Sequence, residues 1–123
     1  MILKGYTRDF EEVLARSGIY AMSSRNEGFP MVLLEAMSHG LPLISFDCPR
    51  GPAEIIEDGV TGRLVADDDI PAYTRALREM IAGEEKRRRM GQASHESARA
   101  YEIETVSGHW ERLFAEVLDR RST

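Results

Sequence analysis

Two glutamates, Glu27 and Glu35, stand eight residues apart around Gly28 and Pro30. Gly28 can take unusual backbone dihedrals and lets a ligand approach the main chain closely. Pro30 fits the start of a helix predicted over residues 31–38, where free amide hydrogens and a partial positive charge suit a phosphate or diphosphate. With Glu27 on the preceding loop, both carboxylates can project toward one crevice and accept hydrogen bonds from sugar hydroxyls. The segment predicts a binding site for an anionic, hydroxyl-rich ligand.

The bare spacing of the two glutamates is common, and it leaves a simpler alternative open. Glu27 could cap its own helix while Glu35 faces solvent. Against this alternative, Glu35 interrupts an apolar run, where a carboxylate should not be buried without a partner. The residues around the pair must therefore decide between the two interpretations.

The elements that must position these residues alternate between strand and helix. Short apolar runs predict strands over residues 2–5, 19–22, 43–46 and 62–65. Between them, helices are predicted over residues 9–18, 31–38 and 52–56. Such alternation implies parallel βαβ units with right-handed crossovers, and ligands in such sheets bind at the carboxyl ends of the strands. We expect a single α/β domain over residues 1–123, a partial Rossmann-like doubly wound parallel sheet of about four strands.

A helical C-terminal tail should follow the last strand. Asp67, Asp68 and Asp69 can cap a helix with one apolar face, made of Ile70, Tyr73, Leu77, Met80 and Ile81. A charged helix follows over residues 84–101. A third helix carries an apolar stripe, made of Val106, Trp110, Leu113, Phe114, Val117 and Leu118. We expect this stripe to lie in the core or at a domain interface, and an exposed stripe would favour self-association.

Composition limits the class of protein. The net charge of −5 and the pI near 5.2 argue against a general nucleic-acid binder. The basic run over residues 86–89 is interpreted as a solvated helix face, with contact to an anionic lipid surface as the alternative. The single cysteine, Cys48, excludes an internal disulfide and favours a reducing cytoplasm. No signal peptide and no apolar run near the roughly 20 residues of a membrane span is present.

Other residues with chemical potential have simpler structural interpretations. We expect His39 to cap the C-terminus of the helix over residues 31–38, with a ligand role as the alternative. Cys48 has no histidine nearby in sequence to activate it as a nucleophile. Asp47 and Arg50 end a strand at the ligand-facing edge. A structural turn is the default interpretation for this pair, and contact with a ligand is the alternative.

Residues 24–30, 34–37 and 40–42 together resemble the E-x7-E signature of the retaining group 1 glycosyltransferases, enzymes with the two-domain GT-B fold. Residues 45–56 and 58–65 resemble the two family blocks that follow. The resemblance spans the chain from about residue 5 to residue 118. It implies that residues 1–123 form part of the C-terminal, nucleotide-sugar-binding domain.

The resemblance also implies roles for individual residues. Glu27 would contact hydroxyls of the transferred sugar and support the transition state, and Glu35 would bind the ribose hydroxyls of the nucleotide. The backbone amides of Gly28, Phe29 and Met31 would face the sugar and the diphosphate, whereas Pro30 has no amide to offer. Val32 and Leu33 would lie along the phosphate or nucleoside side of the helix start.

By the same resemblance, the full enzyme transfers a hexose or N-acetylhexosamine to a glycan or lipid-linked acceptor with retention and without a metal ion or other cofactor. The donor would be a nucleotide sugar, with UDP favoured by residues 45–56. The full enzyme would work in the cytoplasm, with peripheral contact at the inner membrane face. The N-terminal acceptor domain and the basic pair that grips the donor phosphates have no counterpart here. We therefore expect the chain to be inactive alone. The alternatives are a stand-alone binding module and another GT-B enzyme, such as an epimerase or a phosphorylase.

Overall fold

A parallel β-sheet forms the centre of the protein in a computed structural model, which describes residues 1–122. The strands are β1 (Tyr20–Met22), β2 (Leu43–Phe46) and β3 (Gly62–Val65), in the order β1-β2-β3. Tyr20 is in register with Leu43, which in turn is in register with Gly62. Every residue of β2 is buried, as expected for a central parallel strand covered on both faces.

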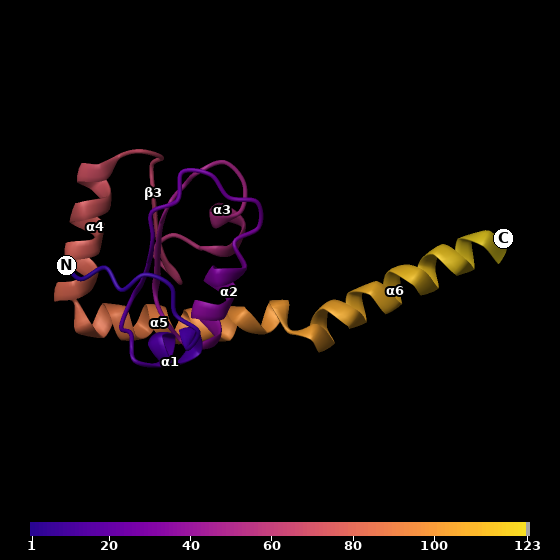
Figure 1. The fold of residues 1–123 in the computed structure, drawn as a ribbon. Helices are drawn as coiled ribbons and strands as arrows, with labels where there is room; N and C mark the ends of the chain where they lie inside the picture. The colour runs from indigo at the N-terminus through magenta and orange to yellow at the C-terminus, as the bar shows by residue number, and fades with distance from the viewer. Residues whose placement is uncertain (123) are drawn as a thin grey trace.

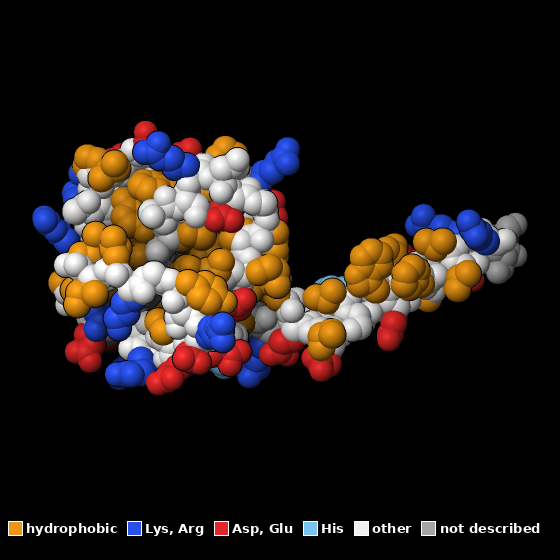
Figure 2. Space-filling view, in the orientation of Figure 1, with side chains coloured by type: hydrophobic (Ala, Val, Ile, Leu, Met, Phe, Trp, Pro, Cys, Tyr) orange, Lys and Arg blue, Asp and Glu red, His pale blue; other side chains and the backbone are white. Residues whose placement is uncertain are grey.

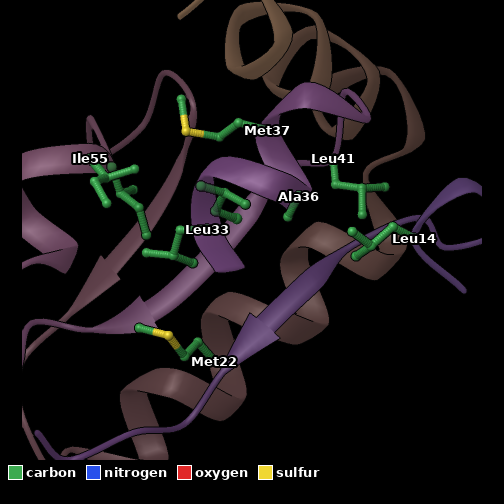
Figure 3. Packing of buried hydrophobic residues seen from close by; sticks show 9 residues of the cluster. Leu14, Met22, Leu33, Ala36, Met37, Leu41 and Ile55 are labelled. Carbon is green, nitrogen blue, oxygen red and sulfur yellow. The ribbon is translucent and has the colours of Figure 1, made fainter. Parts of the chain in front are cut away.

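One face of the sheet is covered by α1 (Phe10–Ala15), α2 (Met31–Ser38) and α3 (Pro52–Ile55). Their buried side chains form one apolar cluster with β1 and β2, part of which Figure 3 shows from close by. In α2, Leu33, Ala36 and Met37 point into this cluster and are completely buried. Helix α2 is therefore fixed to the sheet by its apolar face, which determines where its N-terminus lies.

The other face of the sheet packs against α4 (Ile70–Ala82), and α5 (Glu84–Ala98) runs along the base of the body (Figure 1). The Asp69 carboxylate accepts a hydrogen bond from the Ala72 amide at 2.9 Å and caps α4. The Arg87 guanidinium donates to the Met80 and Ile81 carbonyls at 2.9 and 2.7 Å, which satisfies the C-terminal end of α4. The other three side chains of the basic run over residues 86–89, Lys86, Arg88 and Arg89, are exposed, as the interpretation of a solvated helix face requires.

The predicted apolar face of α4 is buried only in part. Ile70 and Ile81 are 59% and 61% exposed, whereas Ala76 and Met80 are buried. Successive residues of an α-helix are rotated by about 100° around its axis. Both isoleucines therefore point well to one side of Ala76 and Met80, which mark the buried side of the helix. The sequence spacing was helical, but it did not identify which apolar residues face the sheet.

A short 3-10 turn (η1, Arg99–Tyr101) leads into α6 (Ile103–Ser122), which projects away from the body (Figure 1). The α6 stripe, as we call Val106, Trp110, Leu113, Phe114, Val117 and Leu118, is between 39% and 64% exposed. Figure 2 shows its apolar side chains gathered along the projecting helix. The predicted helix is confirmed, but the stripe does not join the core of the described residues.

The α/β architecture with a helical tail is confirmed, with one strand fewer than the four expected. Residues 2–5 form no strand: Ile2 and Leu3 are 83% and 85% exposed. Among residues 1–122, no segment offers them a ladder of hydrogen bonds, and a lone extended segment has nothing to hold it in a sheet. No helix of the described residues is long and apolar enough to cross a membrane.

Candidate functional site

The motif loop, residues 23–30, connects the carboxyl end of β1 to the start of α2. One side of it is tied to the loop after β3 by an ion pair between the Arg25 guanidinium and the Asp68 carboxylate at 3.5 Å. Pro30, at the other end, is buried and begins α2. The Glu27 side chain is half-buried between these anchors, at the edge of the sheet where ligands of parallel α/β proteins bind.

A second loop, residues 47–51, follows β2 and lies against the motif loop. The Asp47 amide donates to the Val65 carbonyl at 2.7 Å, which holds the start of this loop to β3. Gly51 has a left-handed φ of 103°, and a Cβ atom there would overlap Pro30 and lie 2.9 Å from the Gly28 carbonyl oxygen. Only glycine fits this approach without displacing a loop.

The two loops border an open hollow of about 450 Å³ lined by Asn26, Glu27, Gly28, Pro49 and Arg50. A larger hollow of about 1160 Å³ lies between the N-terminal segment and α1, lined by residues from Lys4 to Ser17. Its lining includes Arg16 and Ser17, which lead into the amino end of β1. We favour the smaller hollow because it lies at the carboxyl edge and brings charged side chains and backbone amides together.

Backbone amides at the start of α2 are open to a ligand. Within residues 1–122, no hydrogen bond engages the amides of Gly28, Phe29 or Val32. The Met31 amide is different, because it already donates to the Phe29 carbonyl at 2.9 Å. The amides without a hydrogen bond are therefore a slightly different set from the one expected to face a ligand.

The two glutamates influence the same part of the surface. Burial raises the pKa of the Tyr20 phenol, and the negative charges of Glu27 and Glu35 raise it further. The charges of both glutamates thus act on this one phenol.

The apolar surroundings of Glu35 are explained by the helix itself. Leu33, Ala36 and Met37 face the core, whereas Glu35 is on the exposed side of α2. Its carboxylate makes no hydrogen bond or ion pair with any described residue. Glu27 does not cap α2: the N-cap position is Pro30, and no side chain donates or accepts a hydrogen bond there. The capping part of the simpler alternative is thus wrong.

The remaining predicted site residues differ in what they can present. The side chains of Pro30 and Leu33 are buried, so a ligand could reach only their backbone. Phe29 and Met31 are 46% and 59% exposed, and Val32 is half-buried. Residues 28–33 therefore offer a ligand mainly backbone groups, together with the exposed parts of the Phe29 and Met31 side chains.

Sequence reasoning missed Tyr101, which joins the tail to both sides of the site. Its hydroxyl donates to the Glu54 carbonyl of α3 at 3.2 Å, and its ring centroid lies 6.3 Å from that of Phe29. Tyr101 thus holds the junction of α5 and α6 against the motif loop. No local pattern marks this residue, because the contact depends on how α5 packs beneath α2.

His39 and Cys48 have structural roles. The Nδ1 atom of His39 lies 3.0 Å from the Glu35 carbonyl oxygen at the end of α2, which confirms the capping prediction. Cys48 is buried, and burial raises the pKa of its thiol, as do the negative charges of Asp67, Glu27 and Asp47. A raised pKa leaves the thiol protonated and therefore a poor nucleophile. In the described part of the chain, no three of its His, Cys, Asp and Glu residues are grouped to hold a metal ion.

Comparison with known proteins decides the family. The family model described as "Glycosyl transferases group 1" matches residues 1–97. This chain belongs to the group 1 glycosyltransferases. The match includes the motif loop, the second loop and α2, so the site described above lies in the family's shared segment.

Relatives and a solved structure agree with this assignment. The chain is 34% identical over 120 residues to an exopolysaccharide phosphotransferase of Streptomyces coelicolor, covering 97% of the chain and 13% of that relative. It is 39% identical over 104 residues to the amylovoran biosynthesis glycosyltransferase AmsD of Erwinia amylovora, and the match covers 85% of the chain and 29% of that relative. The pneumococcal O-GlcNAc transferase GtfA, solved in complex with UDP and GlcNAc, matches with a TM-score of 0.74 and 28% identity, covering 89% of this chain and 23% of that one.

The chain spans less than a third of the length of each of these proteins. The two relatives are also named for different reactions, a phosphotransfer and a glycosyl transfer. The shared segment therefore establishes the family and the fold, but it does not specify the donor or the acceptor.

Proposed function

We propose that this chain forms the donor-binding half of a retaining glycosyltransferase that takes a hexose or N-acetylhexosamine from a nucleotide sugar. The observation that carries the proposal is the set of open amides at Gly28, Phe29 and Val32, located between two carboxylates at the carboxyl edge of the sheet. An amide-rich helix start suits a diphosphate. Carboxylates on either side suit the hydroxyls of a sugar and a ribose.

In this proposal, the donor lies along the start of α2. Glu27, half-buried beside the hollow, accepts hydrogen bonds from hydroxyls of the transferred sugar and stabilises the charge that develops during transfer. Glu35, exposed farther along α2, accepts the two ribose hydroxyls. The diphosphate occupies the space between them, where the helix start offsets its charge without a metal ion.

UDP is the nucleotide that we propose for the donor. Support comes from the pneumococcal transferase, which was solved with UDP and GlcNAc and matches most of this chain at 28% identity. The acceptor in the proposal is a glycan or lipid-linked glycan on the cytoplasmic side of a membrane. It is bound by a domain outside residues 1–123, so we expect the chain alone to transfer no sugar.

Titration of the purified chain with UDP, GDP and ADP, followed by amide resonances in NMR spectra, tests the donor site. Because the described residues offer the diphosphate mainly backbone amides in an exposed site, we expect UDP to bind in the millimolar range, about −4 kcal/mol. Glu35→Ala should weaken UDP binding about fivefold to tenfold by removing the ribose contact. The matched control is Glu11→Ala, which removes an exposed carboxylate from α1 and should change nothing.

Two results would contradict the proposal. Glu35→Ala with unchanged affinity for UDP would remove the ribose assignment. Measurable sugar transfer by the wild-type chain in the absence of other protein would remove the assignment of the acceptor to a separate domain.

A further inference from the structure

The carboxyl edge of the sheet is rich in negative charge, which is a difficulty for binding an anionic donor. Glu27, Asp47 and Asp67 lie near enough to act together on the buried Cys48 thiol and raise its pKa. One cation of this edge, Arg25, is already occupied by its ion pair with Asp68. A diphosphate at this edge would need a further positive charge close by.

Arg50 is a cation of this edge with no ion pair or hydrogen bond to any residue of the described chain. Its side chain is exposed, and it lines the hollow that Glu27 and Gly28 also line. Asn26 and Pro49 complete that lining. Arg50 and Gly28, whose amide makes no hydrogen bond, thus line the same hollow from the two loops.

The backbone of Arg50 is held in an uncommon conformation. Its φ is 65°, in the left-handed region that non-glycine residues rarely adopt. The neighbouring Gly51 fixes this geometry, since it is buried against Pro30 and its carbonyl accepts a hydrogen bond from the Glu54 amide at 3.0 Å. Such strain persists where the surroundings over-determine it, and it is found at ligand-binding positions. The second loop therefore presents Arg50 from a rigid base.

We propose that Arg50 contacts the donor diphosphate, so that this chain carries one phosphate-binding cation of its own. The inference rests on the proposed function, because it needs the donor to lie along the start of α2. In this arrangement the helix start and Gly28 bind the diphosphate from one side and the Arg50 guanidinium binds it from the other. A guanidinium suits this role because its parallel N–H groups match two phosphate oxygens.

Three probes separate the contributions: inorganic pyrophosphate, UDP and uridine, each titrated to about 10 mM and followed by amide resonances. Arg50→Asn removes the cation while keeping a residue that tolerates the left-handed region. We expect this variant to bind pyrophosphate and UDP about fivefold to tenfold more weakly. It should bind uridine as the wild type does. Arg50→Lys, which keeps the charge, should lose less affinity than Arg50→Asn.

Arg25→Asn is the matched control, since it removes a cation of the same edge that is already paired with Asp68. It should weaken pyrophosphate binding less than Arg50→Asn does. The unperturbed amide spectrum of each variant away from the two loops checks that it is folded.

The outcomes distinguish this inference from the proposed function. If Arg50→Asn leaves pyrophosphate and UDP affinity unchanged while Glu35→Ala weakens UDP, the Arg50 assignment is wrong and the donor site stands. If pyrophosphate and UDP leave the amide resonances of residues 27–32 unmoved at these concentrations, the donor site is wrong, and the Arg50 assignment fails with it.

Discussion

Replacing Gly51 with alanine should disrupt the contact between the two loops. Gly51 has a φ of 103°, and a Cβ atom there would overlap the Pro30 ring and lie 2.9 Å from the Gly28 carbonyl oxygen. These neighbours belong to the motif loop and the first turn of α2. The substitution therefore introduces both backbone strain and a steric clash at the site.

The two effects have separate magnitudes. With a φ of 103° and a ψ of −63°, Gly51 lies outside the left-handed helical well, so an alanine there is strained by at least about 1–2 kcal/mol relative to glycine. Forcing an extra methyl group into a packed position costs about 1–3 kcal/mol more. We expect Gly51→Ala to lower the free energy of unfolding by about 2–5 kcal/mol, a large fraction of the stability of a domain of this size.

Gly59→Ala is the matched control for backbone strain. Gly59 has a φ of 81°, and nothing lies within 4 Å of the Cβ atom that would be added there. It should cost only the strain of about 1–2 kcal/mol. Urea denaturation followed by circular dichroism measures both variants. A Gly51→Ala variant no less stable than Gly59→Ala would refute the close approach of the two loops.

Three further predictions concern tyrosines and the tail. Burial raises the pKa of Tyr73 to about 12 from 10.0, so its neutral form stabilises the fold fully below pH 10.0, and this contribution is lost as the pH rises through 12. Denaturation of wild type and Tyr73→Phe across this range should show a larger loss of stability in wild type than in the variant, which keeps the raised pKa values of Tyr20 and Cys48. Tyr101→Phe removes the hydrogen bond to the Glu54 carbonyl and should lower the free energy of unfolding, measured by urea denaturation, by about 0.5–1 kcal/mol. Tyr101→Ala also loses the ring contact with Phe29 and should lower it further. Equal effects of the two substitutions would contradict a role for the ring. The exposed α6 stripe should make the chain self-associate, and Trp110→Glu should abolish this in sedimentation velocity while His109→Glu does not.

Local sequence signals predicted the elements at the site well. The bounds of α2, β2 and β3 agree with the structure, because Pro30 permits a helix start and Gly40, with a φ of 70°, ends the helix. The continuous apolar run of β2 likewise identified a strand buried on both faces. The two glutamates were recognised from their spacing and context, and the charges of both act on the Tyr20 phenol.

The remaining features depend on contacts between distant residues. Whether residues 2–5 form a strand depends on a neighbouring strand, which no local pattern reveals. The Met31 amide is engaged by the Phe29 carbonyl, a detail of the turn that the sequence does not specify. The contact between Tyr101 and Phe29 arises from the packing of α5 against α2. Periodicity predicts elements, but their mutual packing decides which groups reach the site.

The central claim is that the segment from Glu27 to Glu35 binds the nucleotide diphosphate of a sugar donor. A crystal structure of this chain with UDP tests it most directly. We expect diphosphate density beside the amides of Gly28, Phe29 and Val32, with the ribose hydroxyls within hydrogen-bonding distance of the Glu35 carboxylate. UDP bound instead in the hollow between α1 and the N-terminal segment, with the start of α2 empty, would contradict it.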